Sequence, residues 1–208
     1  MSERVYIVDD DPDVLDATSL LVSTAGYPSL PLADPDALLE RVTPDDGGCL
    51  ILDVRLPGMN GLELQRELDT RGIRMPIIFI TGHGDIPMAV QAVNAGALDF
   101  LEKPFDNDAL LERVATAIER DRERREHDAA HAEVEQRLGK LTPRERQVME
   151  CILAGKLNKV IGHELGMSTR TVEVHRARVL DKLGARNASE MARRVLAAPS
   201  YRGWLDDS

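Results

Sequence analysis

Short apolar runs separated by helix-patterned segments occupy the first 105 residues, and this alternation constrains the fold more than any other feature of the chain. The apolar runs are 5–8, 49–52, 76–80 and 98–101, and the helical patterns include 13–25, 60–71 and 86–95. Continuous apolar strands are typical of a parallel sheet whose two faces are both covered by helices. A weaker run, Ser29–Leu32, contains Pro31, which cannot donate to a ladder and therefore predicts an edge strand. The sequence thus predicts an α/β domain with a doubly wound parallel sheet of five strands.

Residues 140–198 carry helical patterns only. Thr142, Pro143 and Glu145 form a capping-box start for the first helix. We expect Asn158 to cap the second helix and Ser168 or Thr169 to cap the third, and the fourth to start at about Ala188. Two helices joined by a tight turn that contains glycine are the signature of a helix-turn-helix. We therefore expect a separate all-α domain of four helices.

The net charge of −10 conceals opposite charges on two parts of the chain. Residues 1–120 hold 9 Lys and Arg against 22 Asp and Glu, whereas residues 139–200 hold 12 against 6. A basic unit of this kind is a candidate for binding a phosphate backbone. We predict an acidic domain over 1–120, a helical linker over 121–138, a basic domain over 139–200 and a tail over 201–208.

The predicted linker opens with a run of charged residues and has almost nothing apolar before Val134. We expect a solvated extension of the preceding helix, with charge pairs one turn apart such as Asp121 with Arg125. On this interpretation Arg124→Ala should change little.

The two cysteines, Cys49 and Cys151, lack the spacing of a metal site, and we expect both to be small buried apolar residues. No run approaches the roughly 18 consecutive apolar residues of a membrane span. The N-terminal residues lead straight into a predicted strand, without the pattern of a signal peptide. We therefore expect a cytoplasmic protein with no membrane partner.

Polar residues follow the predicted strands at the point where each strand ends. They are Asp9, Asp10, Asp53, Thr81 and Lys103. Because the carboxyl ends of parallel strands meet at one edge of a sheet, these side chains should converge on one pocket. Grouped carboxylates repel one another and suit a hard divalent cation such as Mg²⁺, while a lysine and a hydroxyl suit phosphate oxygens. The pattern favours phosphoryl transfer onto a carboxylate.

Each of these residues alone has a plainer interpretation. Asp9 and its neighbours could form a turn and a helix N-cap, Asp53 could be a turn former, and Lys103 an ordinary surface residue. A small phosphohydrolase with an aspartate nucleophile is an alternative from another class. It would use Asp9 and Asp11, and its turnover would depend on Asp9 rather than Asp53. The joint pattern across four strand ends favours phosphoryl acceptance.

Residues 1–125 resemble the receiver domain of two-component response regulators, which has a flavodoxin-like fold. The matching segments are 8–12, 52–61, 81–84 and 101–105. The resemblance implies that Asp53 accepts the phosphoryl group. It implies that Asp10, Asp53 and the backbone carbonyl of Arg55 ligate Mg²⁺ (or Mn²⁺), with Asp9 helping, often through water. Thr81 would bind a phosphoryl oxygen, and Lys103 would pair with the phosphoryl group.

The same resemblance implies a cis bond between Lys103 and Pro104. Phe100 takes the position of an aromatic switch, where many relatives carry Tyr. When Thr81 moves, an inward rotation of Phe100 would repack the surface formed by 86–95, 98–102 and 107–120. Arg55 and His83 follow Asp53 and Thr81 by two residues, and we hypothesise that they set the rate of dephosphorylation.

Residues 140–198 resemble the LuxR-type helix-turn-helix output domain through the segments 141–145, 158–161, 165–166 and 168–176. Together with the 82–85 loop, this looks most like the FixJ-like branch of response regulators. The resemblance implies that the third helix lies in the major groove of DNA. The residues expected to bind DNA are Lys159, Arg170, Thr171, Glu173, Val174, Arg176, Ala177, Arg178 and Lys182.

Val172, Val179 and Leu183 should face the core, so that Glu173, Val174 and Ala177 face bases while the basic residues meet phosphates. Many relatives have Lys where this chain has Glu173, and a glutamate can accept from the amino group of cytosine. The resemblance implies that the last helix, with Met191, Val195 and Leu196, is the family's dimer contact on DNA. The alternative is that these residues belong to the core of the domain.

Both resemblances together imply a DNA-binding transcriptional response regulator rather than an enzyme. A sensor histidine kinase would phosphorylate Asp53, and self-dephosphorylation would reverse this. Phosphorylation would favour homodimerisation, release of the C-terminal domain, or both. Promoter DNA and RNA polymerase are the other implied partners. A regulator that acts through protein or RNA is the alternative, and it predicts no salt-dependent, sequence-specific binding of DNA.

Overall fold

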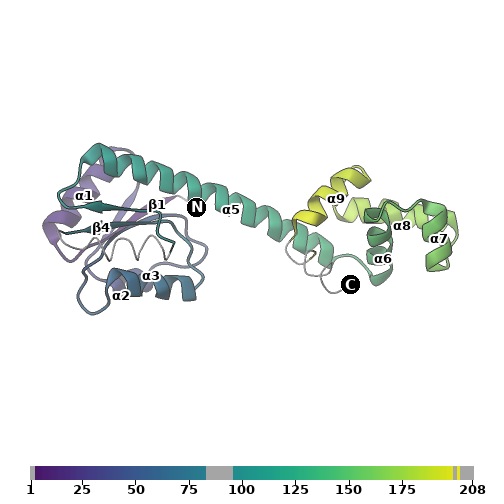
Figure 1. The fold of residues 1–208 in the computed structure, drawn as a ribbon, viewed down its shortest axis with the longest axis horizontal. Helices are drawn as coiled ribbons and strands as arrows, with labels where there is room; N and C mark the ends of the chain where they lie inside the picture. The colour runs from purple at the N-terminus through teal and green to yellow at the C-terminus, as the bar shows by residue number, and fades with distance from the viewer. Residues whose placement is uncertain (1–2, 83–95, 199–200, 202–208) are drawn as a thin grey trace. The chain divides into compact units, whose positions relative to one another are not determined.

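The computed structural model describes residues 3–82, 96–198 and 201, and its contacts divide the chain into two units, 1–125 and 126–208 (Figure 1). The first unit is a parallel sheet with flanking helices and the second is helical, which confirms the predicted fold class. The division falls after Arg125 rather than after Arg120. The predicted helix over 86–95 lies outside the described residues.

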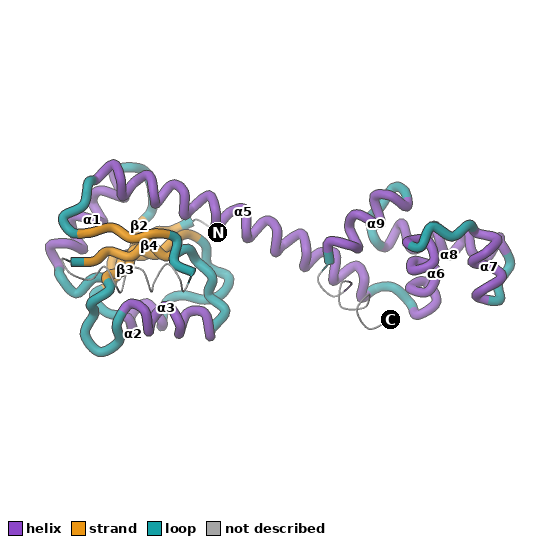
Figure 2. The backbone as a smooth tube through the Cα atoms, in the orientation of Figure 1, coloured by secondary structure: helices purple, strands orange, loops and turns teal. Residues whose placement is uncertain are grey.

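The strands of the first unit, orange in Figure 2, form one parallel sheet. Their order in the sheet is β2-β1-β3-β4-β5. The strands are β1 (Arg4–Val8), β2 (Ser29–Leu32), β3 (Gly48–Asp53), β4 (Ile77–Thr81) and β5 (Asp99–Glu102). Pro31 lies on the edge strand β2, as its missing N–H predicts. The chain runs from β1 out to β2 and then returns to β3 on the other side of β1. The strand order therefore reverses between β1 and β3, where ligand sites of open α/β sheets form.

Helices cover both faces of this sheet (Figure 1). They are α1 (Pro12–Thr24), α2 (Pro35–Leu39), α3 (Gly61–Thr70) and the first part of α5 (Asn107–Gly139). Successive residues of β4 point to opposite faces, so Phe79 packs in one buried cluster with Leu64 while Ile78 packs in another with Val114. A sheet buried on both faces explains why its strands read as continuous apolar runs.

The described residues of the second unit after α5 form the helices α6 (Pro143–Leu153), α7 (Asn158–Leu165), α8 (Thr169–Lys182) and α9 (Ala188–Ala197). The capping box of Thr142 and Glu145 is present, and Ser168 caps α8. The predicted cap of α7 is wrong, because Leu157 occupies the N-cap position and Asn158 is the first helical residue.

The core of the second unit extends beyond these four helices at both ends of the chain segment. Leu138 of α5 is buried in it, and so is Tyr201 from the predicted tail. The tail therefore starts with a core residue. Its other residues, 202–208, lie outside the described part of the chain.

Both cysteines are free thiols with buried side chains, as predicted. Burial, together with a smaller contribution from the nearby carboxylate of Asp121, raises the pKa of Cys49 to about 12. Among the described residues, none of the helices combines the length and the apolar composition that crossing a bilayer requires.

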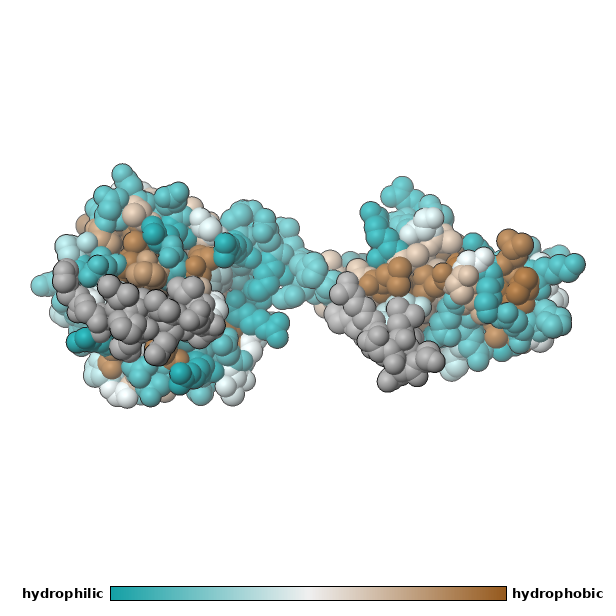
Figure 3. Space-filling view, viewed as in Figure 1, coloured by the Kyte–Doolittle hydropathy of each residue, from teal (hydrophilic) through white to brown (hydrophobic). Residues whose placement is uncertain are grey.

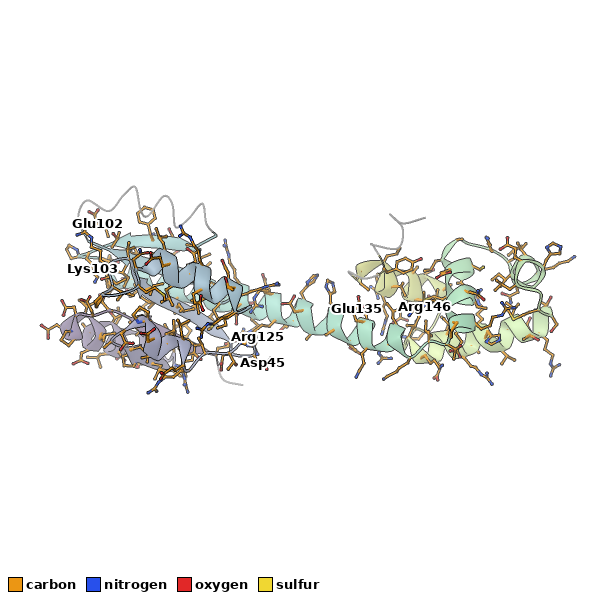
Figure 4. All side chains as sticks on the ribbon, turned by 90° about the horizontal axis from the view of Figure 1, so that it is seen from below. Asp45, Glu102, Lys103, Arg125, Glu135 and Arg146 are labelled. Carbon is orange, nitrogen blue, oxygen red and sulfur yellow. The ribbon has the colours of Figure 1, made fainter. Side chains whose placement is uncertain are left out.

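The expectation of a solvated charge run is wrong at Asp121, whose side chain is fully buried. Its carboxylate accepts from the Gly48 N–H at 2.9 Å and from Arg124 Nη2 at 2.5 Å. The expected pair of Asp121 with Arg125 does not form, since Arg125 donates to the Asp45 carbonyl at 2.8 Å (Figure 4). The first turn of the predicted linker is thus attached to the loop that precedes β3.

Candidate functional site

Three acidic side chains meet at the carboxyl end of the sheet. Asp9 and Asp10 follow β1 directly, and Asp53 is the last residue of β3. One carboxylate oxygen from each lies within 4.8 Å of the other two. Asp9 and Asp53 are buried, whereas Asp10 is exposed. The neighbouring positions of β1 and β3 in the sheet produce this cluster.

Lys103 reaches the same cluster from the loop after β5. Its Nζ donates to Asp9 Oδ2 at 2.6 Å and to Asp53 Oδ2 at 2.5 Å. The Lys103 N–H donates to the Thr81 carbonyl at 2.8 Å, and the Lys103–Pro104 bond is cis, as predicted. The ammonium group thus sits between two carboxylates and offsets part of their repulsion.

The burial of this cluster changes the acidity of its members. Burial raises the pKa of Asp9, and the hydrogen bonds from Lys103 and the Asp11 N–H offset that rise only in part. For Lys103, burial lowers the pKa, but the hydrogen bonds to Asp53 and Asp9 outweigh it and leave the pKa above its usual value. The lysine is therefore held as a cation inside the pocket.

The backbone around Asp53 is shaped to present its carboxylate. The Arg55 N–H donates to Asp53 Oδ1 at 2.8 Å. Gly61 opens α3 against the end of β3, and a Cβ there would lie 2.6 Å from the Asp53 carbonyl oxygen and 2.8 Å from the Phe79 ring. Asn60 caps α3 in a capping box with Glu63. A glycine is needed because the helix starts so close to the acidic strand end.

Asp11 points away from this chemistry. Its side chain accepts from the Asp13 N–H at 2.9 Å and caps α1. The alternative of an aspartate-nucleophile phosphohydrolase needs Asp11 beside Asp9 in the pocket. A capping role for Asp11 argues against that alternative.

The two predicted switch residues lie on adjacent strands. Thr81 is buried, and its hydroxyl donates to the Gly82 carbonyl at 3.3 Å rather than to a pocket carboxylate. Phe100 is half-buried against the core and pairs in register with Phe79. His83 and the predicted segment 86–95 lie outside the described residues.

A second candidate site lies on α8. Val172, Val179 and Leu183 are buried in the core, as expected from their spacing. The opposite side of the helix is exposed and carries most of the residues expected to bind DNA. These are Arg170, Thr171, Glu173, Val174, Ala177 and Arg178, with Lys159 exposed on α7.

Apolar side chains are also exposed around this helix. Val174 is 46% exposed, and Leu157 and Val160 at the start of α7 are 75% and 43% exposed. Figure 3 shows brown, hydrophobic patches among the teal, hydrophilic surface of this unit. Val174 therefore offers an accessible methyl group on the same side of α8 as Arg170 and Arg178.

Two of the expected DNA contacts are engaged within the second unit. Lys182 Nζ donates to Glu145 Oε2 at 2.5 Å and to the Lys140 carbonyl at 3.1 Å. Arg176 is half-buried, with Nη1 3.4 Å from Asn158 Oδ1. Lys182 thus ties the end of α8 to the capping box that opens α6, a pairing that no local sequence signal announces.

The expectation for the last helix needs correction. Met191 and Val195 are fully buried in the intradomain core, so they cannot provide an open dimer contact. Leu196, by contrast, is 46% exposed. The regular spacing of these apolar residues reflects packing inside the unit.

Comparison with known proteins identifies relatives of both units. A family described as response regulator receiver domain matches residues 5–115, and bacterial regulatory proteins of the luxR family match residues 139–195. Transcriptional regulatory protein FixJ of Azorhizobium caulinodans is 43% identical over 194 residues, 93% of this chain and 92% of that one. The C4-dicarboxylate transport transcriptional regulatory protein DctR of Rhodobacter capsulatus is 43% identical over 93% of this chain and 99% of its own. The solved structure of response regulator StyR matches with a TM-score of 0.89 and 39% identity, over 94% and 99% of the two chains.

Proposed function

The chain belongs to the two-component response regulators that join a receiver domain to a LuxR-type DNA-binding domain, and we propose that Asp53 is the residue that accepts the phosphoryl group. The observation that carries the proposal is the Lys103 ammonium, which lies 2.5 Å from Asp53 Oδ2 beside two further carboxylates. Asp53 therefore has both a cation and further oxygen ligands within reach, and it shares that lysine with Asp9.

A sensor histidine kinase is the implied phosphoryl donor. An Asp53 oxygen would form a bond to phosphorus while the bond from phosphorus to the donor imidazole breaks, and the imidazole nitrogen keeps the electron pair. The Lys103 ammonium already donates to Asp53 Oδ2, and it would donate to a phosphoryl oxygen once Asp53 is phosphorylated. Thr81 would turn its hydroxyl from the Gly82 carbonyl to another phosphoryl oxygen.

The acidic cluster fits a hard divalent cation, Mg²⁺ or Mn²⁺. Its donors are carboxylate oxygens of Asp9, Asp10 and Asp53, to which we add the backbone carbonyl of Arg55. Such an ion would neutralise negative charge on the phosphoryl oxygens. The fit rests on three carboxylates within 4.8 Å of one another with one lysine among them.

We assign the response to phosphorylation to Thr81 and Phe100. Movement of Thr81 toward the phosphoryl group would vacate space beside β4, and Phe100 on the neighbouring strand would rotate inward. Phe100 is only half-buried, so an inward rotation would bury ring surface that is now exposed, and this burial would favour the rotated position. Arg55 lies beside Asp53 and would limit the approach of water, which hydrolyses the acyl phosphate by attack on phosphorus.

For DNA, we assign α8 to the major groove. Glu173, Val174 and Ala177 would face bases, with Val174 suited to a thymine methyl and Glu173 to a cytosine amino group. The remaining contacts, to phosphates, are assigned to Lys159, Arg170, Thr171, Arg176 and Arg178. Lys182 is left out of this set because its ammonium is bonded to Glu145 and Lys140.

Phosphorylation would favour a homodimer, release of the C-terminal unit, or both, and so allow binding to a two-fold symmetric promoter site. RNA polymerase and a cytoplasmic location belong to the same proposal. For the domain limits we propose 1–125 and 138–201, since Arg125 contacts the first unit, and Leu138 and Tyr201 are buried in the second.

Intact mass after incubation with acetyl phosphate and Mg²⁺ tests the proposal. One phosphoryl group is expected on the wild-type chain and none on Asp53→Asn, with peptide mapping to locate the adduct. Asp9→Asn is the matched comparison, because it removes a neighbouring carboxylate and leaves Asp53 in place. An adduct that persists in Asp53→Asn would overturn the assignment.

DNA binding is tested separately by fluorescence anisotropy on selected duplexes. Beryllofluoride, a stable mimic of the phosphoryl group, should increase the affinity of the wild-type chain and leave Asp53→Asn unchanged. Equal affinities for all duplexes at every salt concentration would contradict sequence-specific binding.

A further inference from the structure

Two histidines lie one helical turn apart on α5. The ring centroids of His127 and His131 are 3.9 Å apart, and the rings are tilted by 57°. Residues four apart on a helix share a face, which accounts for this contact. His127 is exposed and His131 half-buried, so solvent and ions reach the pair.

Neither histidine takes part in the proposed receiver or DNA chemistry. The residues of this stretch of α5 that pack in the C-terminal core are Leu138 and, in part, Val134. Both histidines come after Arg125, the last residue of the first unit. Neither proposed site therefore uses the pair. The two imidazole rings lie together on an accessible surface of α5.

We propose that His127 and His131 form a chelating site for a transition-metal ion of the Zn²⁺, Ni²⁺ or Cu²⁺ class. Neutral imidazole is the ligand these ions prefer, and two histidines at this helical spacing can bind one ion. The rings are close enough that side-chain rotation brings one nitrogen of each to a common ion. Water completes the coordination.

The ligand chemistry separates this site from the acidic pocket. Asp9, Asp10 and Asp53 offer oxygen atoms only and suit Mg²⁺, whereas the histidine pair offers nitrogen. A softer ion should therefore choose the histidines when Mg²⁺ fills the pocket. Since both ligands belong to one turn of α5, the bound ion should also stabilise the helix around residues 127–131.

Calorimetric titration of the untagged full-length chain with Ni²⁺, in saturating Mg²⁺, tests the site. One Ni²⁺ per chain is expected. His127→Gln and His131→Gln should each weaken Ni²⁺ binding by at least about tenfold. Removing even a residue that only hydrogen-bonds to a metal ligand lowers metal affinity about 10- to 100-fold, and these changes remove a ligand itself. His163→Gln, a change at an exposed histidine of α7, should leave binding unchanged. Asp53→Asn should also bind Ni²⁺ like the wild type.

A shifted pair provides the sharpest control. His131→Ala combined with Ala132→His keeps two imidazoles on the helix but moves one of them off the shared face. This variant should bind Ni²⁺ as weakly as His131→Gln, while its far-ultraviolet circular dichroism stays that of the wild type. Equal Ni²⁺ affinity in the shifted and wild-type chains, or no Ni²⁺ uptake by the wild type, would overturn the proposal.

Discussion

Asp121 accepts a hydrogen bond from the backbone N–H of Gly48 at 2.9 Å, across 73 positions of the sequence. The carboxylate is fully buried, and Arg124 is its charged partner at 2.5 Å. Gly48 has a φ of +131°, and a Cβ there would collide with the Arg4 carbonyl oxygen. A strand start that only glycine can adopt is thus joined to the helix that leaves the first unit.

Asp121→Ala should destabilise the first unit strongly. It leaves the Gly48 N–H and the Arg124 guanidinium without their buried partner, and breaking a buried pair costs about 3–5 kcal/mol. Hydrogen exchange of the β3 amides in the full chain measures the loss. Glu123→Ala, an exposed change on the same helix, is the control and should leave the exchange rates unchanged.

Arg124→Ala should also destabilise the first unit, contrary to the expectation for a solvated linker. It removes the charge partner of a buried carboxylate, and a hydrogen bond to a charged group is worth about 1.5–3 kcal/mol. Chemical denaturation of the variant against the wild type checks this. A change as small as that of Glu123→Ala would show that the Gly48 N–H alone satisfies Asp121.

The second unit should lose stability in acid through Glu145. The hydrogen bond from Lys182, with those of Thr142, lowers the pKa of Glu145 from 4.5 to about 2. A carboxyl group whose pKa is lower in the folded chain stabilises it above pH 4.5, and this contribution is lost as the pH falls toward about 2. Glu145→Gln should flatten the dependence of the melting temperature on pH over this interval.

Glu150→Gln is the control for that experiment, because Glu150 is exposed on the same helix. Its melting temperature should follow the wild-type dependence on pH. The same slope in Glu145→Gln and the wild type would assign the acid sensitivity to other groups.

Arg178→Ala should weaken DNA binding almost equally on all sequences. A lost phosphate contact reduces the slope of log affinity against log salt concentration by about 0.9. Anisotropy titrations across a salt series measure that slope. Arg193→Ala on α9 changes another exposed arginine, away from α8, and should keep the wild-type slope.

Lys103→Ala should separate phosphorylation from output. Asp53 keeps its carboxylate, so mass spectrometry should still find the adduct, although less of it. Without the ammonium that bridges Asp9 and Asp53, the activated geometry is not held, and phosphodonor should no longer raise DNA affinity. A phosphodonor response equal to that of the wild type would refute a coupling role for Lys103.

Local patterns were sufficient to predict most of the fold. The strands around Ile7, Ile51 and Ile78 are buried on both faces, so their apolar runs are unambiguous. Parallel strand ends then bring Asp9, Asp53 and Lys103 together without further assumption. Residue type does not reveal the N-cap of α7, because Asn158 is a favourable cap whereas the chain uses Leu157 there.

Features that depend on distant partners could not be predicted. In the sequence, Asp121 looks like a solvated charged residue of a helix. Only the structure shows that its carboxylate is buried and bonded to Gly48 and Arg124. The hydrogen bond of Lys182 to Glu145, 37 positions away, likewise has no local signal in the sequence. Met191 and Val195 have the apolar spacing of either an interface or a core, and only the packing of α9 distinguishes these.

Helix α5 contributes Val114 to one hydrophobic core and Leu138 to the other. Recombination that exchanges output modules between such regulators must therefore preserve both sets of contacts. A breakpoint at residue 120 would detach Asp121 from Gly48, and one at residue 139 would import a foreign residue at position 138. The stretch between Arg125 and Val134 belongs to neither core, so it is where gene fusions in this family should find a tolerated junction.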